Sequence, residues 1–138
     1  MAKKVYIATP VNSRSEAKIE EKREAAYKRI KEIEYRLSKA VKGYEFAEFH
    51  SSFDADIAPI NIELTKKMFG MGLPSEAVIM GKCVQRVMEC DVVFLDYEWS
   101  LSRGCKLEWF AALTYGKDVH YVTDYDIICM SHKAMHRV

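Results

Sequence analysis

A short apolar run in the second half of the chain constrains the fold more than any other feature. Val92 to Leu95 are four consecutive apolar residues, with Asp91 before them and Asp96 after them. A continuous run of this length is typical of a strand that is buried on both faces of a parallel sheet. We therefore predict an α/β protein in which a strand ends at Asp96.

The loop after this strand, residues 96–102, carries two carboxylates, two aromatic residues and two serine hydroxyl groups. A helical pattern then begins at Arg103 and places Glu108 about one turn inside the helix. In open α/β sheets, ligands bind at the carboxyl ends of the strands, next to the helices that follow them. The loop is therefore expected to form part of a binding crevice.

The other segments alternate between strand and helix patterns. The order of elements predicts a doubly wound, Rossmann-like parallel sheet of four to five strands, with strand order 2-1-3-4 and helices on both faces. The strand at 44–49 is expected at or near a sheet edge. Strands are expected at residues 4–9, 44–49, 92–95 and 117–123, and helices at 16–41, from Pro74 up to Cys90, at 103–115 and, as a short helix, within 125–138.

In that topology the crevice lies between the first and third strands. Residues at the ends of these strands and at the start of the following helix would then face one another. They are Thr9, Pro10, Asn12, Asp96, Tyr97, Ser102, Arg103 and Gly104.

A long connection covers residues 55–73 of what we predict to be a single domain spanning residues 1–138. Residues 61–69 predict a short helix, and Gly70 and Gly72 a flexible joint. Connections of this length in compact domains are more often functional than idle. We expect either a lid or a contact between subunits, and the pattern leaves both open.

Composition and charge exclude several classes of partner. The formal net charge is +1, which gives no excess of attraction to a nucleic acid polymer or to an acidic membrane surface. No apolar run approaches the length of a membrane span, and the first residues show no cleavable signal pattern. We therefore expect a cytoplasmic protein. The four cysteines have irregular spacing, which favours reduced, buried thiols over disulfides.

A metal site is not predicted. Cys129, His132 and His136 have spacing like that of metal ligands, but a fourth ligand is missing.

Four motifs occur in order along the chain: residues 6–10, residues 90–95, Ser102 to Glu108 with Ala112, and residues 115–119. Together they resemble the nucleoside 2-deoxyribosyltransferase superfamily. The run Ser-Arg-Gly-x-x-Leu-Glu at 102–108 is most similar to a short bacterial and phage branch of it. The resemblance covers most of the chain and is weak from Asp54 to Leu73.

The resemblance implies that Glu108 attacks the anomeric carbon of a nucleoside or nucleotide, without a cofactor. Physically, a carboxylate held against that carbon stabilises the positive charge that develops on the sugar. The helix dipole near the start of the helix is expected to favour the ionised form of this carboxylate. The alternative is a surface glutamate in a first helical turn. Relatives complete their sites with a neighbouring subunit, so a homo-oligomer is expected.

The remaining candidate residues each have two interpretations. Asp96 would bind a base edge or a ribose hydroxyl, or cap the following loop. Arg103 would bind a phosphate or sugar hydroxyls, or pair with Glu98 or Asp96. Tyr6 is expected in the core, although its hydroxyl would also be able to orient Glu108. Trp99 would stack on a base or cover a subunit interface.

Phe110 stands where the relatives usually carry glycine, and we expect Phe110, Trp99 and Arg103 to narrow or reshape the space for a sugar. The sequence therefore predicts N-glycosidic bond chemistry, either transfer or hydrolysis. A binding or sensing module that uses the same crevice without turnover, and a structural subunit, are the alternatives. The sequence leaves open which base and sugar are bound and whether a 5′-phosphate is required.

Overall fold

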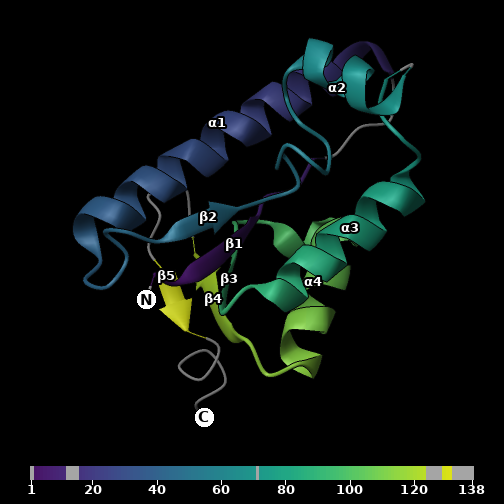
Figure 1. Ribbon diagram of the computed structural model, residues 1–138. Helices are drawn as coiled ribbons and strands as arrows, with labels where there is room; N and C mark the ends of the chain where they lie inside the picture. Colours follow the sequence, from purple (N-terminus) through teal and green to yellow (C-terminus); the bar gives the residue numbers. More distant parts are fainter. Residues whose placement is uncertain (1, 12–15, 71, 124–128, 132–138) are drawn as a thin grey trace.

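A five-stranded sheet in the order β2-β1-β3-β4-β5 forms the centre of the computed structural model, which describes residues 2–11, 16–70, 72–123 and 129–131 (Figure 1). The first four strands in this order are parallel, and β5 runs antiparallel to β4. The predicted strand order 2-1-3-4 is confirmed. The strands are β1 (Lys4–Ala8), β2 (Glu48–His50), β3 (Val92–Leu95), β4 (Asp118–Val122) and β5 (Cys129–Ser131).

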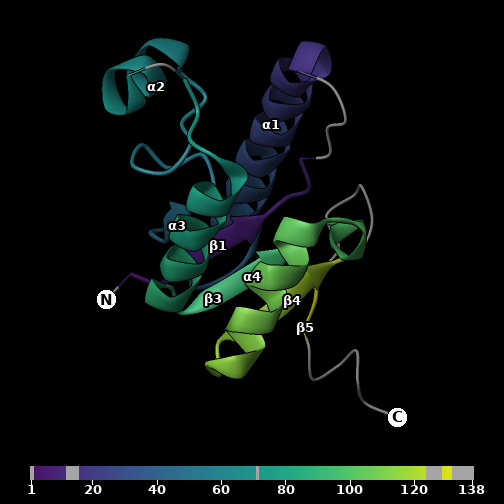
Figure 2. The same cartoon turned by 90° about the vertical axis from the view of Figure 1, so that its right-hand side faces the viewer.

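Both faces of the sheet are covered by helices, as predicted. The helix α1 (Glu16–Ala40) lies on one side, and α3 (Glu76–Glu89) and α4 (Arg103–Thr114) lie on the other (Figure 2). All four residues of β3 are buried, which confirms the strand that the apolar run predicts. Alternation along the strands sends Val92 and Phe94 to the α1 side and Val93 and Leu95 to the α3 and α4 side.

The helix α1 packs on the sheet through one apolar stripe. Ala26, Ile30, Ile33 and Leu37 recur at intervals of three and four, and all are buried. Ala40 and Val41, which the same pattern places on this stripe, are exposed at the end of the helix.

The helices on the opposite face begin at serine caps. The Ser75 hydroxyl accepts a hydrogen bond from the amide of Val78 at the start of α3, and Pro74 therefore precedes the helix instead of lying in its first turn. Ser102 caps α4 in the same way. On α3, burial concentrates at Cys83 and Val87, whereas Val78 and Met88, predicted for the same apolar face, are exposed because the helix has only one side on the sheet.

Two other predicted segments differ from the structure. The strand β2 lies at the sheet edge as expected but begins only at Glu48, because residues 44–47 form turns that fold the ring of Tyr44 into the core beside Phe94. The short helix predicted within 125–138 is wrong at residues 129–131, where β5 extends the sheet; the other residues of that segment lie outside the described part of the chain.

The long connection contains the predicted short helix α2 (Ile62–Phe69), which Asn61 caps by accepting hydrogen bonds from two backbone amides. In both views α2 stands apart from the sheet (Figures 1 and 2). Gly70 and Gly72 both have positive φ, which glycine adopts without strain. Among the helices of the described residues, none is long and apolar enough to cross a bilayer.

Candidate functional site

A cavity of about 780 Å³ opens where the ends of several elements meet. Its walls come from the residues after β1, the first half of α1, the segment 52–58, and the amino ends of α3 and α4. This is the end of the sheet at which the topology predicts a crevice. Of the predicted site residues, the cavity is lined by Thr9, Ser102, Arg103, Gly104 and Glu108.

Glu108 is one of the residues that line this cavity. The side chain comes from the buried face of α4 and is only 6% exposed. No described residue makes a hydrogen bond of standard geometry to it; the Tyr6 hydroxyl is near enough to interact with the carboxyl, but the two groups miss that geometry. A buried carboxyl in this situation has capacity for a ligand.

Burial raises the pKa of Glu108 to about 7, and the nearby Tyr6 hydroxyl lowers it by less. The helix dipole favours the ionised form, as predicted for a group near a helix start, but the net pKa is raised because the cost of desolvating the charge is larger. A carboxyl with this pKa exchanges protons near neutral pH and suits acid, base or nucleophilic roles.

Three other buried side chains surround Glu108. Tyr6 of β1 is fully buried, and its hydroxyl has no hydrogen-bond partner among the described residues. Burial raises the pKa of Tyr6 well above its usual value and raises that of Cys83 to about 12. The pKa of Cys105 is also raised by burial. These groups therefore stay neutral at physiological pH, and the thiols are poor nucleophiles.

The cysteines are reduced where the structure describes their side chains. Cys83, Cys90 and Cys105 are buried and free, as predicted. Cys83 and Cys105 also line the cavity. Within the described residues, no group of three histidine, cysteine or acidic side chains is placed to hold a metal ion. His132 and His136 of the sequence's metal-like spacing lie outside the described residues.

Asp96 lies beside the cavity and not in it. Its carboxylate receives two hydrogen bonds from Nε and a third, at 3.0 Å, from Nη2 of Arg29 on α1. It also accepts a hydrogen bond from the Thr9 hydroxyl at 3.1 Å and one from the amide of Tyr97 at 2.7 Å. Because Thr9 lines the cavity, Asp96 contacts the site through Thr9. The contact with Tyr97 agrees with the capping interpretation of Asp96.

The other predicted residues of the loop spread over several surroundings. Arg103 is mostly exposed and lies 3.7 Å from the carboxylate of Glu76 at the mouth of the cavity, so its predicted pairing with Glu98 or Asp96 is not what the structure shows. Tyr97 is 37% exposed. Neither Tyr97 nor the half-buried Pro10 lines the cavity, and Asn12 lies outside the described residues.

Aromatic residues of this region do not narrow the cavity, contrary to expectation. The ring of Trp99 packs against Trp109 at 5.2 Å and Tyr121 at 5.6 Å between ring centres. Phe110 is 64% exposed on the outer face of α4. Neither Trp99 nor Phe110 lines the cavity, whereas Arg103, the third residue expected to affect the space for the sugar, does.

Gly104 allows α3 to approach the start of α4 closely. A Cβ atom at this position would lie 3.1 Å from the sulfur of Met80 and 3.3 Å from its terminal methyl group. Both Gly104 and Met80 line the cavity. Glycine therefore sets the spacing of the two helix ends that form this wall.

Arg23 was not predicted as a site residue, yet it lines the cavity from α1 and is only 9% exposed. Its Nη2 donates hydrogen bonds to the carbonyl oxygens of Ala58 at 2.6 Å and Pro59 at 2.8 Å, and its guanidinium lies over the ring of Phe53. A signal was present, because Arg23 occupies the same face of α1 as Ala26 and Ile30. A charged residue in an apolar stripe indicates a buried polar contact.

The site thus combines a buried, titratable carboxyl with a hydrogen-bonding wall and two arginines. In comparisons with known proteins, no protein-family model and no curated sequence matches this chain.

Proposed function

We propose that the protein acts on the N-glycosidic bond of a nucleoside or nucleotide, as a deoxyribosyltransferase or hydrolase, with Glu108 as the nucleophile. The observation that carries the proposal is Glu108, a residue only 6% exposed that lines a cavity of about 780 Å³. The resemblance of the motif at 102–108 supports the same role. We also propose, from the sequence pattern, that it works in the cytoplasm and, from the resemblance, that it is a homo-oligomer and needs no cofactor.

The proposed reaction needs only the Glu108 carboxylate, the nucleobase that leaves, and water. Glu108 attacks C1′, the C1′–N bond breaks, and its electron pair leaves with the base, which takes up a proton. Water then attacks C1′ and gives up one proton, the bond between C1′ and Glu108 breaks, and the carboxylate is restored. The proton that water gives up balances the one that the nucleobase took up, so that one water molecule has cleaved one bond. In a transferase, a second base takes the place of the water.

The pKa of about 7 fits this sequence, since the ionised form needed for attack is substantially populated near neutral pH. Rigid attachment to α4 favours a fixed position against the sugar. Thr9 and Ser102, at the same wall, offer hydroxyl groups to the sugar.

A second candidate function is binding without turnover, as in a nucleotide sensor. It is favoured by the position of Asp96, whose carboxylate is held by Arg29 and Thr9 beside the cavity. Among the described residues, the acids that line the cavity are Glu76 and Glu108, and Glu76 lies beside Arg103 at the mouth. A base that activates water for the second step is therefore not evident.

The test is base release from a panel of 2′-deoxynucleosides and their 5′-monophosphates, followed by chromatography. The wild-type protein, Glu108→Gln and Glu32→Gln are compared. We expect free base from the wild type, and a rate at least about 1,000-fold lower in Glu108→Gln, because the amide is a poor nucleophile. Glu32→Gln makes the same change on an exposed part of α1 and should keep the wild-type rate.

Equal release from wild type and Glu108→Gln would contradict the role of Glu108. No release from either protein, with a rise in melting temperature on adding a nucleotide, would support the sensor and reject the enzyme.

A further inference from the structure

Arg23 is a buried cation at the wall of the cavity. It is 9% exposed, and no carboxylate lies within 4 Å of its guanidinium among the side chains that the structure describes. Burial lowers the pKa of Arg23, and attraction to Glu20 raises it by less. Burying a charge without an ion-pair partner is unfavourable. Other interactions of the guanidinium must therefore offset this cost.

The known contacts of Arg23 account for only part of its guanidinium. Both hydrogen bonds, to the carbonyl oxygens of Ala58 and Pro59, come from Nη2. These contacts fix the segment that leads into α2. They use only one of the three nitrogen atoms of the guanidinium. A guanidinium has five N–H donors in a planar fork, so Nε and Nη1 keep the capacity to donate to a ligand.

The charges that line the cavity favour an anion. Among the described side chains, two arginines, Arg23 and Arg103, face two acids, Glu76 and Glu108. Glu76 is already beside Arg103, and Glu108 is partly neutral near pH 7. Among the described residues, Arg23 is therefore left as the buried positive charge of the cavity that has no ion pair, since Glu20 attracts it only from beyond ion-pair distance. A guanidinium in such a position binds phosphate oxygens with charge-assisted hydrogen bonds.

We propose that Arg23 binds a phosphate monoester carried by the substrate, so that the preferred ligand of the cavity is a nucleotide and not a nucleoside. The proposal rests on the proposed function for the nucleoside part of the ligand. It names the substrate class of the same site. Arg23 thereby links ligand binding to the segment that leads into α2, because one guanidinium contacts both.

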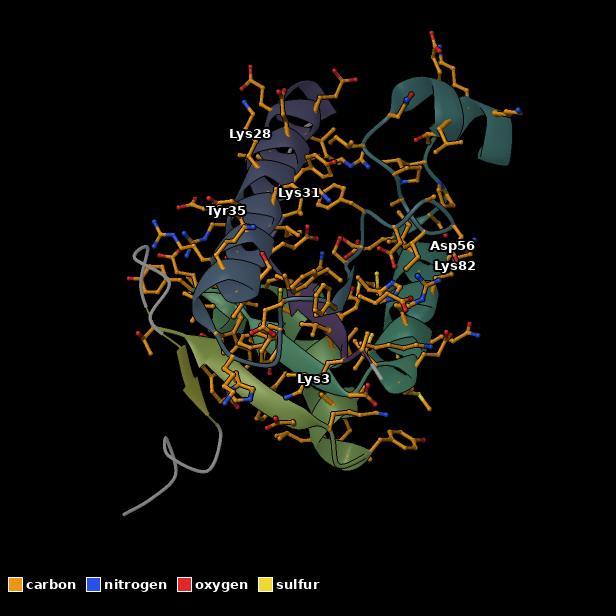
Figure 3. All side chains as sticks on the ribbon, turned by 60° about the vertical axis from the view of Figure 1, so that its left-hand side comes forward. Lys3, Lys28, Lys31, Tyr35, Asp56 and Lys82 are labelled. Carbon is orange, nitrogen blue, oxygen red and sulfur yellow. The ribbon has the colours of Figure 1, made fainter. Side chains whose placement is uncertain are left out.

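Binding is measured by isothermal titration in the Glu108→Gln background, where no base is released. The four common 2′-deoxynucleosides and their 5′-monophosphates are titrated into this protein and into the same protein carrying Arg23→Gln or Lys28→Gln. Lys28 lies on α1, is strongly exposed, does not line the cavity, and provides the matched loss of one charge (Figure 3).

We expect the reference protein to bind the best monophosphate about 10- to 100-fold more tightly than its nucleoside, the range of one or two charge-assisted hydrogen bonds. Arg23→Gln should reduce this preference to near one while leaving nucleoside affinity similar. Lys28→Gln should keep the preference. Inorganic phosphate, but not acetate at the same concentration, should compete with the monophosphate.

A purely structural Arg23 gives a different result, because Arg23→Gln then weakens nucleoside and nucleotide equally and leaves the preference intact. That result, no preference in the reference protein, or equal competition by acetate would overturn the proposal. If Arg23→Gln does not fold, the Nε–H signal of Arg23 is followed by nuclear magnetic resonance during titration with inorganic phosphate. A shift of that signal supports the site, and its absence overturns it.

Different results would reject the proposed glycosidic function and the proposed phosphate site at Arg23. A nucleotide preference that depends on Arg23 in a protein that releases no base would leave a nucleotide-binding module. Base release at equal rates from nucleosides and nucleotides would keep the glycosidic function and reject the phosphate site.

Discussion

Burial of Glu108 links the stability of the protein to pH. Tyr6, Cys83 and Cys105 surround its carboxyl from three elements, and each stays neutral because burial raises its pKa. The pKa of Glu108 rises from an ordinary 4.5 to about 7 in the folded protein. Between these two values the folded state binds more protons than the unfolded state, so the free energy of unfolding falls as pH rises.

We therefore expect Glu108 to destabilise the protein above pH 7 by about 3 kcal/mol relative to pH 4. Glu108→Gln removes this titration. The measurement is urea unfolding of both proteins from pH 4 to pH 8, taking the difference at each pH so that other groups cancel. The free energy of unfolding of Glu108→Gln should rise relative to that of the wild type as pH rises. A difference between the two free energies that is constant with pH would contradict the raised pKa.

Single residues of the site were predictable when their position follows from an element boundary. Thr9, Ser102 and Gly104 follow strand ends or begin a helix, and parallel topology brings such positions together. Arg23 and Arg29 were not predicted, because each lies inside a long, highly charged helix. Only tertiary contacts, with Pro59 for Arg23 and with Asp96 for Arg29, distinguish them from solvated arginines.

At the scale of elements, the contact between α3 and α4 depends on Gly104. The space that its missing side chain leaves is occupied by Met80 of α3. Gly81, the neighbour of Met80 in the chain, has no atom within 4 Å of where its Cβ would lie. The two glycines therefore form a natural pair for comparison.

We expect Gly81→Ala to raise the free energy of unfolding by about 1 kcal/mol, because alanine has the higher helix propensity. Gly104→Ala should gain less or lose stability, since the thioether of Met80 must move by a few tenths of an ångström. Thermal unfolding of both variants measures the difference. A larger gain from Gly104→Ala than from Gly81→Ala would show that the helix contact is loose.

Elements with a regular apolar pattern were predictable, and those that depend on distant partners were not. The run at β3 and the stripe of α1 correspond directly to buried faces. The aromatic residues within 44–47 match the pattern of a strand, but this segment forms turns. Tyr44 is buried because its ring packs against Phe94. The strand β5 is only three residues long and pairs with β4, so its sequence carries little local signal.

At the scale of the whole molecule, the ion pair between Asp96 and Arg29 ties the end of β3 to α1. The side chains of Arg29 and Asp96 are 15% and 4% exposed. Three hydrogen bonds connect them, and Asp96 also binds Thr9 at the end of β1. Asp96 thus fixes the helix and both central strands at the end of the sheet where the cavity opens.

Asp96→Asn should lower the free energy of unfolding by about 3 kcal/mol, because it removes one partner of a buried ion pair and keeps the positive charge. Glu24→Gln removes an acid from the exposed pair with Lys28 and should cost under about 1 kcal/mol. Urea unfolding at pH 7 compares them. Similar small losses in the two variants would mean that the ion pair does not hold β3 to α1.

The strand order was predictable because right-handed crossovers between parallel strands allow few arrangements. The position of the connection at 55–73 was not, because it follows no regular pattern outside α2. Its described part is held by the contacts of Arg23 with Ala58 and Pro59 and by the bond of the Thr65 hydroxyl to Pro59. Such contacts join backbone carbonyl groups to side chains that are far apart in the sequence or follow no regular spacing, so no sequence pattern predicts them.

The packing of Trp99 against Trp109 provides an optical reporter. These are the chain's two tryptophans, and Trp109 follows Glu108 directly on α4. Their indole rings lie 5.2 Å apart at 34°, and the Trp109 Nε1 donates to the hydroxyl of Tyr121. All tryptophan fluorescence therefore originates from one cluster beside the site. Its emission and the coupled circular dichroism of the two indoles should register ligand entry without any attached dye.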